Sequence, residues 1–278
     1  MDHTDVEAQA GTCEAAAEAG AAVATDAFRG SLTVETKSDP MDSVSEVDRA
    51  AQRAVVAEIR ERSAAPIVAE EDLDGVDTLS SLPEAGPAWV VDPIDGTNNY
   101  VAGNRNWGVA VACVTDAAAL RTPTDRDPDA TPVVAVNEMP ALGDTYRLAD
   151  GTTRNGEAVT TSARTDTARF GVNPIFATAA VDRERLPPVV ETVMSEFGDL
   201  RRYGCAQLVL SCVAAGELDA AVSRVGLNPW DVVGGVEMVR AAGGEVTTAA
   251  GEPWTPSATS LVATNGEAHE AVVAAFDP

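Results

Sequence analysis

The chain has 278 residues and a formal net charge of −25, from 44 acidic and 19 basic side chains. A hydrophobic content of 45% supports a sizeable core, in one large or two ordinary domains, and excludes a disordered chain. The acidic balance argues against nucleic-acid binding, which needs clustered cations. Since no apolar run approaches ~18 residues, no membrane span is expected either.

The kinds of charged residue add two expectations. Lys37 is the single lysine, and the other basic residues are all arginines. An acidic, lysine-poor surface is typical of proteins adapted to high intracellular salt, where screening removes self-repulsion. The acidic N-terminus, Met1-Asp2-His3-Thr4-Asp5, lacks the pattern of a signal peptide, so we expect a cytoplasmic protein.

The cysteines and histidines limit the possible chemistry. None of the cysteines has the spacing of a metal site, and we expect reduced, mostly buried thiols. They are Cys13, Cys113, Cys205 and Cys212. The two histidines, His3 and His269, lie near the ends of the chain, and we expect both in solvent. Histidine acid–base catalysis and histidine-ligated zinc are therefore not expected.

Turn signals and periodicity in the first half predict two helices and a series of short strands. The helices are expected over 5–28 and from Ser45 to about residue 59. The strands are expected at 31–35, 67–69, 88–91, 108–114, 132–136 and 145–148. An acidic surface loop is expected over 115–131 and a hairpin turn over 154–157. The pattern indicates an antiparallel sheet covered by helices.

The second half alternates between strands and helices, which indicates an α/β unit. The strands are expected at 170–175, 218–223, 245–249 and 260–264, with a short extended piece at 201–204. The helices are expected at 183–197, 205–216, 231–242 and 266–276. We expect two domains: 1–150, α+β with the large antiparallel sheet, and 151–278, α/β. The boundary falls somewhere in 140–170.

The motif after the strand at 88–91 is the feature around which we expect the site to form. Asp92 and Asp95 flank Pro93, which fixes the backbone between them. Two carboxylates held toward one point suit a hard cation such as Mg²⁺, which requires oxygen ligands. Gly96 lets backbone N–H groups come close to a bound anion. The alternative is a polar turn after a strand.

Asp92-Pro93-Ile94-Asp95-Gly96-Thr97 resembles the signature of the inositol monophosphatase family of metal-dependent phosphatases. Three further blocks in the same order extend the resemblance over most of residues 30–270. These blocks are the segment from Lys37 to Asp48, the pair Glu70-Glu71 after Ala69, and Trp230-Asp231 with Gly234-Gly235. Taken alone, Asp48 and Asp231 are also explained as charges at helix N-termini, and Lys37 as a chance surface lysine.

The resemblance implies an α+β / α/β fold, the layered αβαβα sandwich of the inositol monophosphatase and fructose-bisphosphatase type. It also implies an enzyme that uses two or three Mg²⁺ ions to hydrolyse a phosphomonoester with an activated water. By resemblance, one ion would use Glu70, Asp92 and the Ile94 carbonyl. A second would use Asp92, Asp95 and Asp231.

Roles for the remaining site residues also come from the resemblance. Thr97, with Asp48 behind it, would orient or deprotonate the attacking water near Glu70. Backbone N–H groups at Gly96 and Thr97 would hold the phosphate, and Asp95 would contact the substrate. Gly204-Cys205-Ala206 would line its alcohol side, and Lys37 would lie in a mobile loop.

Two positions depart from the family pattern. Cys205 replaces a hydroxyl by a thiol, which is a weaker hydrogen-bond donor. Arg224 stands where animal-type inositol monophosphatases carry a glutamate that meets inositol hydroxyls. An arginine there favours a second phosphate or another anionic group; the alternative is a side chain in solvent.

The substrate expected first is inositol monophosphate, and fructose 1,6-bisphosphate is its nearest rival. Histidinol phosphate and 3′-phosphoadenosine nucleotides rank lower. Two other classes stay open: a catalytically silent relative that acts as a binding or regulatory partner, and a metal-buffering acidic protein. By resemblance we also expect a homodimer and inhibition by Li⁺.

Overall fold

The computed structural model describes residues 3–30, 34–36, 43–122, 133–176 and 184–276. Lys37 and the loop predicted around it lie outside these residues. Within them, no helix combines the length and the apolar character that a bilayer crossing requires.

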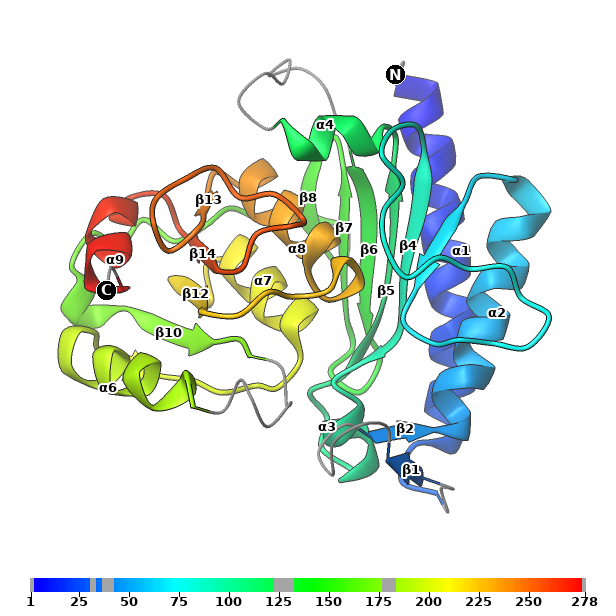
Figure 1. Cartoon of the computed structure of the whole chain (residues 1–278), viewed down its shortest axis with the longest axis horizontal. Helices are drawn as coiled ribbons and strands as arrows, with labels where there is room; N and C mark the ends of the chain where they lie inside the picture. Colours follow the sequence, from blue (N-terminus) through cyan, green and yellow to red (C-terminus); the bar gives the residue numbers. More distant parts are fainter. Residues whose placement is uncertain (1–2, 31–33, 37–42, 123–132, 177–183, 277–278) are drawn as a thin grey trace.

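Five layers form the molecule (Figure 1), as expected for an αβαβα sandwich. Helices α1 (His3–Ala27) and α2 (Glu46–Arg62) cover the outer face of a seven-stranded sheet. Helices α7 (Ala206–Ala214) and α8 (Pro229–Ala241) lie between this sheet and a five-stranded one. Helices α6 (Leu186–Glu196) and α9 (His269–Phe276) cover the far side of the second sheet.

The seven-stranded sheet runs in the order β3-β4-β5-β6-β7-β8-β9, and all neighbours are antiparallel except β3 and β4. Its strands are β3 (Ile67–Ala69), β4 (Ala88–Asp95), β5 (Gly108–Val114), β6 (Val133–Met139), β7 (Asp144–Ala149), β8 (Gly151–Arg154) and β9 (Glu157–Ala158). The turn predicted at 154–157 joins β8 and β9, with Asn155 and Gly156 both at positive φ, as a two-residue hairpin requires.

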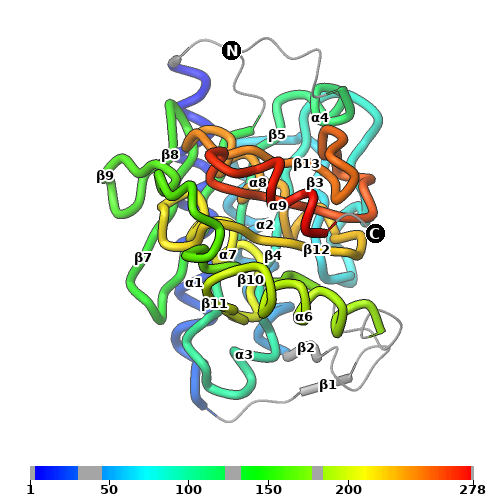
Figure 2. The backbone as a smooth tube through the Cα atoms, turned by 90° about the vertical axis from the view of Figure 1, so that its left-hand side faces the viewer, coloured from blue at the N-terminus to red at the C-terminus, as the bar shows by residue number. Residues whose placement is uncertain are grey.

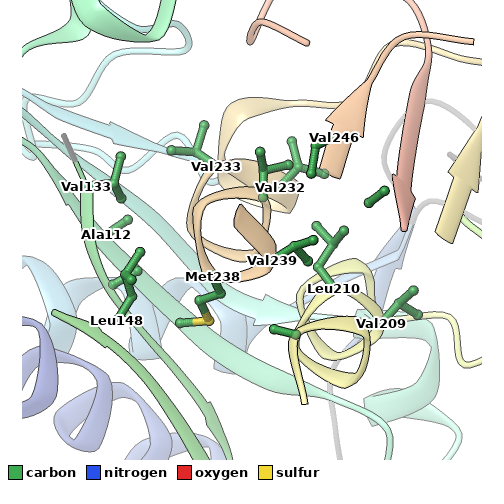
Figure 3. Close-up of a cluster of buried hydrophobic side chains, with 14 of the residues drawn as sticks. Ala112, Val133, Leu148, Val209, Leu210, Val232, Val233, Met238, Val239 and Val246 are labelled. Carbon is green, nitrogen blue, oxygen red and sulfur yellow. The ribbon is translucent and has the colours of Figure 1, made fainter. Parts of the chain in front are cut away.

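Alternation along β4 and β5 explains how one sheet serves two cores. Trp89 and Val91 belong to the cluster under α1 and α2, whereas Ala88 and Val90 belong to the cluster under α7 and α8. Successive strand residues point to opposite faces, so a strand buried on both sides is apolar at every position. Figure 3 shows the second cluster, in which valines of α8 pack against the sheet.

The five-stranded sheet has the order β11-β10-β12-β14-β13. Its strands are β10 (Gly171–Pro174), β11 (Asp199–Leu200), β12 (Ala220–Ser223), β13 (Glu245–Thr247) and β14 (Leu261–Thr264). Parallel pairing joins β10 to β11 and β12, and β14 pairs antiparallel with β12 and β13. Seen from the side in Figure 2, α6 and α9 lie next to one another over this sheet.

Several elements differ from the sequence-based expectation. The expected loop 115–131 contains a short helix, α4 (Ala117–Arg121), capped by the Asp116 side chain, which accepts from the Ala118 N–H at 3.1 Å. The extended piece expected at 201–204 is instead β11, at 199–200. Two short strands, β1 (Val34–Thr36) and β2 (Ser43–Ser45), form a separate pair of which only the first overlaps a predicted strand. A 3₁₀ turn at Thr167–Arg169 and helix α3 (Thr97–Val101) complete the elements.

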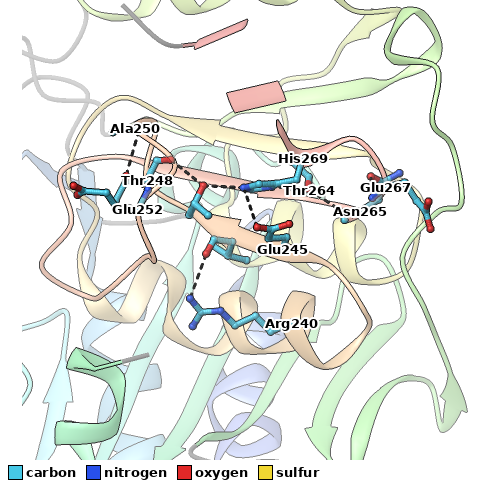
Figure 4. A network of polar contacts seen from close by, with 12 residues as sticks. Arg240, Glu245, Thr248, Ala250, Glu252, Thr264, Asn265, Glu267 and His269 are labelled. Carbon is cyan, nitrogen blue, oxygen red and sulfur yellow. Dashed lines mark hydrogen bonds and ion pairs between the residues drawn. The ribbon is translucent and has the colours of Figure 1, made fainter. Parts of the chain in front are cut away.

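The prediction that His269 lies in solvent is wrong. Its ring is 5% exposed and lies between two hydroxyls, with Nε2 2.8 Å from Thr247 Oγ1 and Nδ1 2.8 Å from Thr264 Oγ1. Figure 4 shows this contact, with Glu245 at the edge of the ring. Because α9 begins at His269 and packs on β13 and β14, closeness to the chain end did not bring exposure. Burial lowers the pKa of His269.

Candidate active site

The end of β4 brings Asp92 and Asp95 to one place. The pairing of β4 with β5 is regular up to Asp92 and shifts between Asp92 and Asp95, where Pro93 lies. Asp92 Oδ1 accepts from the Ile94 N–H at 3.1 Å, which closes the turn. Both aspartates are buried, at 1% and 6% exposed. The irregularity lets residues three apart along a strand share one side, which regular alternation forbids.

Gly96 is required by the shape of this turn. Its φ is +86°, which L side chains rarely adopt, and a Cβ would lie 3.0 Å from the carbonyl oxygens of Asn106 and Gly204. The Asn99 side chain links the same two backbone segments, because it donates to the carbonyls of Asn106 and Tyr203, each at 2.7 Å. The motif at the end of β4 is thereby fixed against the segment that leads into α7.

Thr97 and Asp48 are in direct contact, as predicted. Thr97 Oγ1 lies 3.0 Å from Asp48 Oδ1 and 3.1 Å from the Ile94 carbonyl oxygen. Asp48 is fully buried on the first turn of α2. Because a threonine hydroxyl carries one proton and two lone pairs, Thr97 can donate to Asp48 and still accept from a further group.

Asp92 is the centre of a group of carboxylates. Its burial, and then the negative charges of Glu70, Asp95, Asp231 and Asp48 in that order, raise its pKa well above the ordinary value. These groups come from β4, from α8, from α2 and from the residue that follows β3. Like charges gathered around a buried acid destabilise one another, so this arrangement calls for a positive charge.

Asp95 faces the N-terminus of α7. Its oxygens accept from the backbone N–H groups of Ala206 at 3.1 Å and Gln207 at 2.6 Å, and from the Cys205 thiol at 3.1 Å. Burial raises the pKa of Asp95, and these donors oppose the rise. Cys205 thus donates as the family's hydroxyl would, and burial together with the Asp95 charge raises the pKa of the thiol. All four cysteines are free and buried, as predicted.

Glu70 and Asp231 come from two different elements, the end of β3 and the first turn of α8. Glu70 is half-buried directly after β3, and Glu71 beside it is 5% exposed and tied through its backbone to the Gln52 side chain at 2.6 and 2.9 Å. Asp231, in the first turn of α8, accepts from the Asn228 backbone N–H and side-chain amide, each at 3.1 Å. The helix end stabilises the Asp231 carboxylate and fixes its direction.

The donor chemistry of this cluster fits a hard divalent cation. Glu70, Asp92, Asp95 and Asp231 offer carboxylate oxygens, and the Ile94 carbonyl belongs to the same turn, which is the ligand type that Mg²⁺ prefers. Within the described residues, however, no three carboxylate, thiol or imidazole groups already surround one point as metal ligands. Three of these carboxylates, Asp92, Asp95 and Asp231, instead accept from backbone N–H groups. Cation binding would therefore draw the carboxylates closer together.

Arg224 is placed apart from the carboxylates. Its guanidinium donates to the Phe276 carbonyl at the end of α9 and lines the hollow between α6 and α9. This follows from strand parity, because Ala220 and Val222 on β12 pack in the cluster under α6 and α9, and residue 224 continues that face. The contact of Arg224 with substrate stays a prediction.

Two residues near the site were not predicted. Gln207 joins α7 to α8: its side chain donates to the Trp230 carbonyl at 2.7 Å and accepts from the Gly235 N–H at 2.9 Å. Arg202 carries a positive charge that lowers the pKa of Asp95. In the sequence, a second arginine before Gly204 in an otherwise acidic chain was the available signal for Arg202. Gln207 had no signal beyond its place on a helix.

Comparison with known proteins gives the same family. The model of the inositol monophosphatase family matches residues 5–278. An inositol-1-monophosphatase of Bacillus subtilis is 29% identical over 244 residues, covering 86% of this chain and 84% of the relative. A fructose-1,6-bisphosphatase/inositol-1-monophosphatase of Thermotoga maritima is 28% identical over 243 residues, with the same coverage.

A solved structure agrees. An IMPase of Thermotoga maritima superposes with a TM-score of 0.77 at 26% identity and covers 94% of this chain and 93% of its own. Fold, motif and full-length match point the same way. The chain therefore belongs to the inositol monophosphatase family, whose members are phosphoric monoester hydrolases that are generally metal-dependent.

Proposed function

We propose that this chain hydrolyses the phosphomonoester of a small alcohol, with inositol monophosphate as the first candidate and Mg²⁺ as the cofactor. The observation that carries the proposal is the buried turn with Asp92 and Asp95 at the end of β4, where the charges of Glu70, Asp95, Asp231 and Asp48 all raise the pKa of Asp92. A protein gains no stability from such a cluster by itself, so a function is its simplest explanation.

The proposed ligand sets divide the cluster between two ions. Glu70, Asp92 and the Ile94 carbonyl would hold one, and Asp92, Asp95 and Asp231 the other, with Asp92 shared. When bound, the cations would neutralise the phosphoryl oxygens and lower the pKa of a neighbouring water. The number of ions in the working enzyme, two or three, belongs to the proposal.

The chain's own residues would orient and deprotonate the water. Thr97 can pass its proton to Asp48, 3.0 Å away, while its lone pairs accept from a water placed next to it. Asp48 is fully buried, so solvent does not separate its carboxylate from Thr97. Glu70, half-buried on the other side, would accept from the same water.

The phosphate and the alcohol would occupy different edges of the site. Backbone N–H groups at Gly96 and Thr97 would bind the phosphate, since the left-handed conformation of Gly96 turns successive N–H groups in one direction. The segment Gly204-Cys205-Ala206, held next to Gly96, would line the alcohol side. Its Ala206 N–H and Cys205 thiol also keep Asp95 in place.

A second candidate substrate is fructose 1,6-bisphosphate. The Thermotoga relative, which is 28% identical and covers 86% of this chain, carries that activity in its name. Histidinol phosphate and 3′-phosphoadenosine nucleotides follow. Inhibition by Li⁺, a homodimer, a cytoplasmic location and adaptation to high salt are further parts of the proposal, supported by the family resemblance and by the charge of −25.

The test is phosphate release from a panel of these substrates, with and without Mg²⁺, for the wild type and for Asp95→Asn and Asp231→Asn. Each carboxamide keeps the size of the side chain but removes its charge, so we expect hydrolysis to be abolished while the fold is kept. Circular dichroism supplies the fold control. Retained hydrolysis in both variants would refute the ligand assignment, and a wild type inactive on every substrate would favour a silent, regulatory relative.

A further inference from the structure

Arg202 is held on the segment that leads from β11 into α7. Its guanidinium carbon stacks 4.1 Å from the centre of the Phe176 ring. Its Nη1 lies 3.0 Å from the point where a Cβ of Gly204 would be, so a side chain at residue 204 would displace it. A guanidinium over an aromatic face is attracted to the ring and restricted in its orientation. The position of the Arg202 guanidinium is therefore restricted, although the side chain is exposed.

The charge of Arg202 reaches the carboxylate cluster. The Arg202 Nη1 lies beside Gly204, and the next two residues, Cys205 and Ala206, donate to Asp95. The charge of Arg202 also lowers the pKa of Asp95. Asp95 is the carboxylate that contacts Cys205 and Ala206, on the proposed alcohol side. The cation therefore lies at that edge of the site.

The N–H groups of Arg202 can bind a ligand, because in the part of the chain that the structure describes no carboxylate or carbonyl accepts a hydrogen bond from its guanidinium. The guanidinium instead stacks on the Phe176 ring. The adjacent Arg201 differs: it forms an ion pair with Asp199. A guanidinium presents five N–H groups in a fork that matches a phosphate.

We propose that Arg202 binds a second anionic group, a phosphate on the alcohol part of the substrate. This chain would then prefer a bisphosphorylated small polyol to the monophosphate with the same scissile bond. The inference rests on the proposed function, because it takes Gly204-Cys205-Ala206 as the alcohol side. It transfers to Arg202 the role that the sequence suggested for Arg224, which faces α9 instead.

The test compares fructose 1,6-bisphosphate with fructose 1-phosphate, which differ by the second phosphate alone. For the wild type, kcat/KM should be higher with the bisphosphate. In Arg202→Gln, KM for the bisphosphate should rise roughly tenfold, as expected for one lost charge-assisted contact, with kcat little changed. In the same variant, KM for fructose 1-phosphate should change by less than about twofold. Arg202→Lys keeps the charge but loses the forked arrangement of N–H groups, so its KM for the bisphosphate should lie between those of the wild type and Arg202→Gln.

The matched control is Arg201→Gln, which removes the same charge one residue away and should leave the preference intact. Equal effects of Arg202→Gln on both sugars, or a wild type without preference, would overturn the inference. Calorimetric binding of the two sugars separates this from the proposed function. Preference in binding that depends on Arg202, without any hydrolysis, would refute the phosphatase proposal and keep the contact.

Discussion

Two buried aspartates, Asp92 and Asp219, show how differently this fold treats acidic groups. Asp219, 1% exposed, is fully partnered: it accepts from the Gly171 N–H at 2.8 Å, from Arg164 at 2.9 Å and from the Ser162 hydroxyl. Asp92, equally buried, accepts from the Ile94 N–H, and the negative charges of four other carboxylates raise its pKa.

The difference separates structural from functional burial. Around Asp219, a cation and two donors compensate the desolvation of the carboxylate, and the result ties the start of β10 to β12. Around Asp92 the neighbouring charges add to the cost of burial. We infer that Asp219 stabilises the fold, whereas the cluster at Asp92 lowers its stability until a divalent cation is bound.

The largest expected effect is on activity. Asp92→Asn removes the carboxylate shared by both proposed ions, so Mg²⁺-dependent phosphate release should fall by roughly 10³-fold or more. Unfolding in urea without divalent ions should show the variant to be at least as stable as the wild type, because one repelling charge is gone. A variant that is clearly less stable would break the contrast with Asp219.

The opposite result is expected at Asp219. Asp219→Ala leaves the Gly171 N–H and the Arg164 guanidinium without their acceptor, and should lower the free energy of unfolding by about 3 kcal/mol. Asp166→Ala is the control: this exposed residue caps a 3₁₀ turn and should cost about 1 kcal/mol or less. Urea unfolding measures both, and an equal loss in the two variants would contradict the argument.

A smaller effect is expected at His269, which extends the contrast to a neutral buried group. His269→Gln loses ring contacts to Thr247 and Thr264, at about 1 kcal/mol each near pH 8. Because burial lowers the pKa of His269 below 6.5, its stabilising contribution is complete above pH 6.5 and is lost as pH falls through the folded-state pKa. The stability gap between wild type and variant should therefore narrow in acid; a constant gap would contradict this.

The smallest expected effect is that of salt on the melting temperature. Exposed carboxylates repel one another across the surface of a chain with charge −25, so the melting temperature should rise from dilute buffer to molar KCl. The same rise is expected in Asp92→Asn, since a buried cluster is screened much less than the surface. An unchanged melting temperature in the wild type would count against salt adaptation.

Most helices and strands were predicted well because the apolar pattern of a sequence reports burial directly, whereas the layered arrangement was implied by the family resemblance. The strand predicted at 108–114 agrees with β5, whose continuous apolar run is a local feature of the sequence. The motif residues Asp92, Asp95 and Thr97 could be predicted for another reason. They are close together in the sequence, and Pro93 and Gly96 restrict the backbone between them.

Contacts between distant segments could not be predicted in this way. His269 is buried because two threonines, 22 and 5 residues earlier, meet it, and Arg224 turns outward because of strand parity. The position of Arg202 depends on its contacts with Phe176 and Gly204, which are visible only in the folded chain. The division at residue 150 likewise stays a prediction, because α7 and α8 pack on both sheets.

Calorimetric titration of Mg²⁺ into the wild type and Asp231→Asn tests the central claim most directly. If residues from β4, α8 and the end of β3 jointly hold divalent ions, the wild type binds Mg²⁺ and the variant, which differs by one charge, loses at least one of the binding events. Identical titration curves for the two proteins would contradict the account.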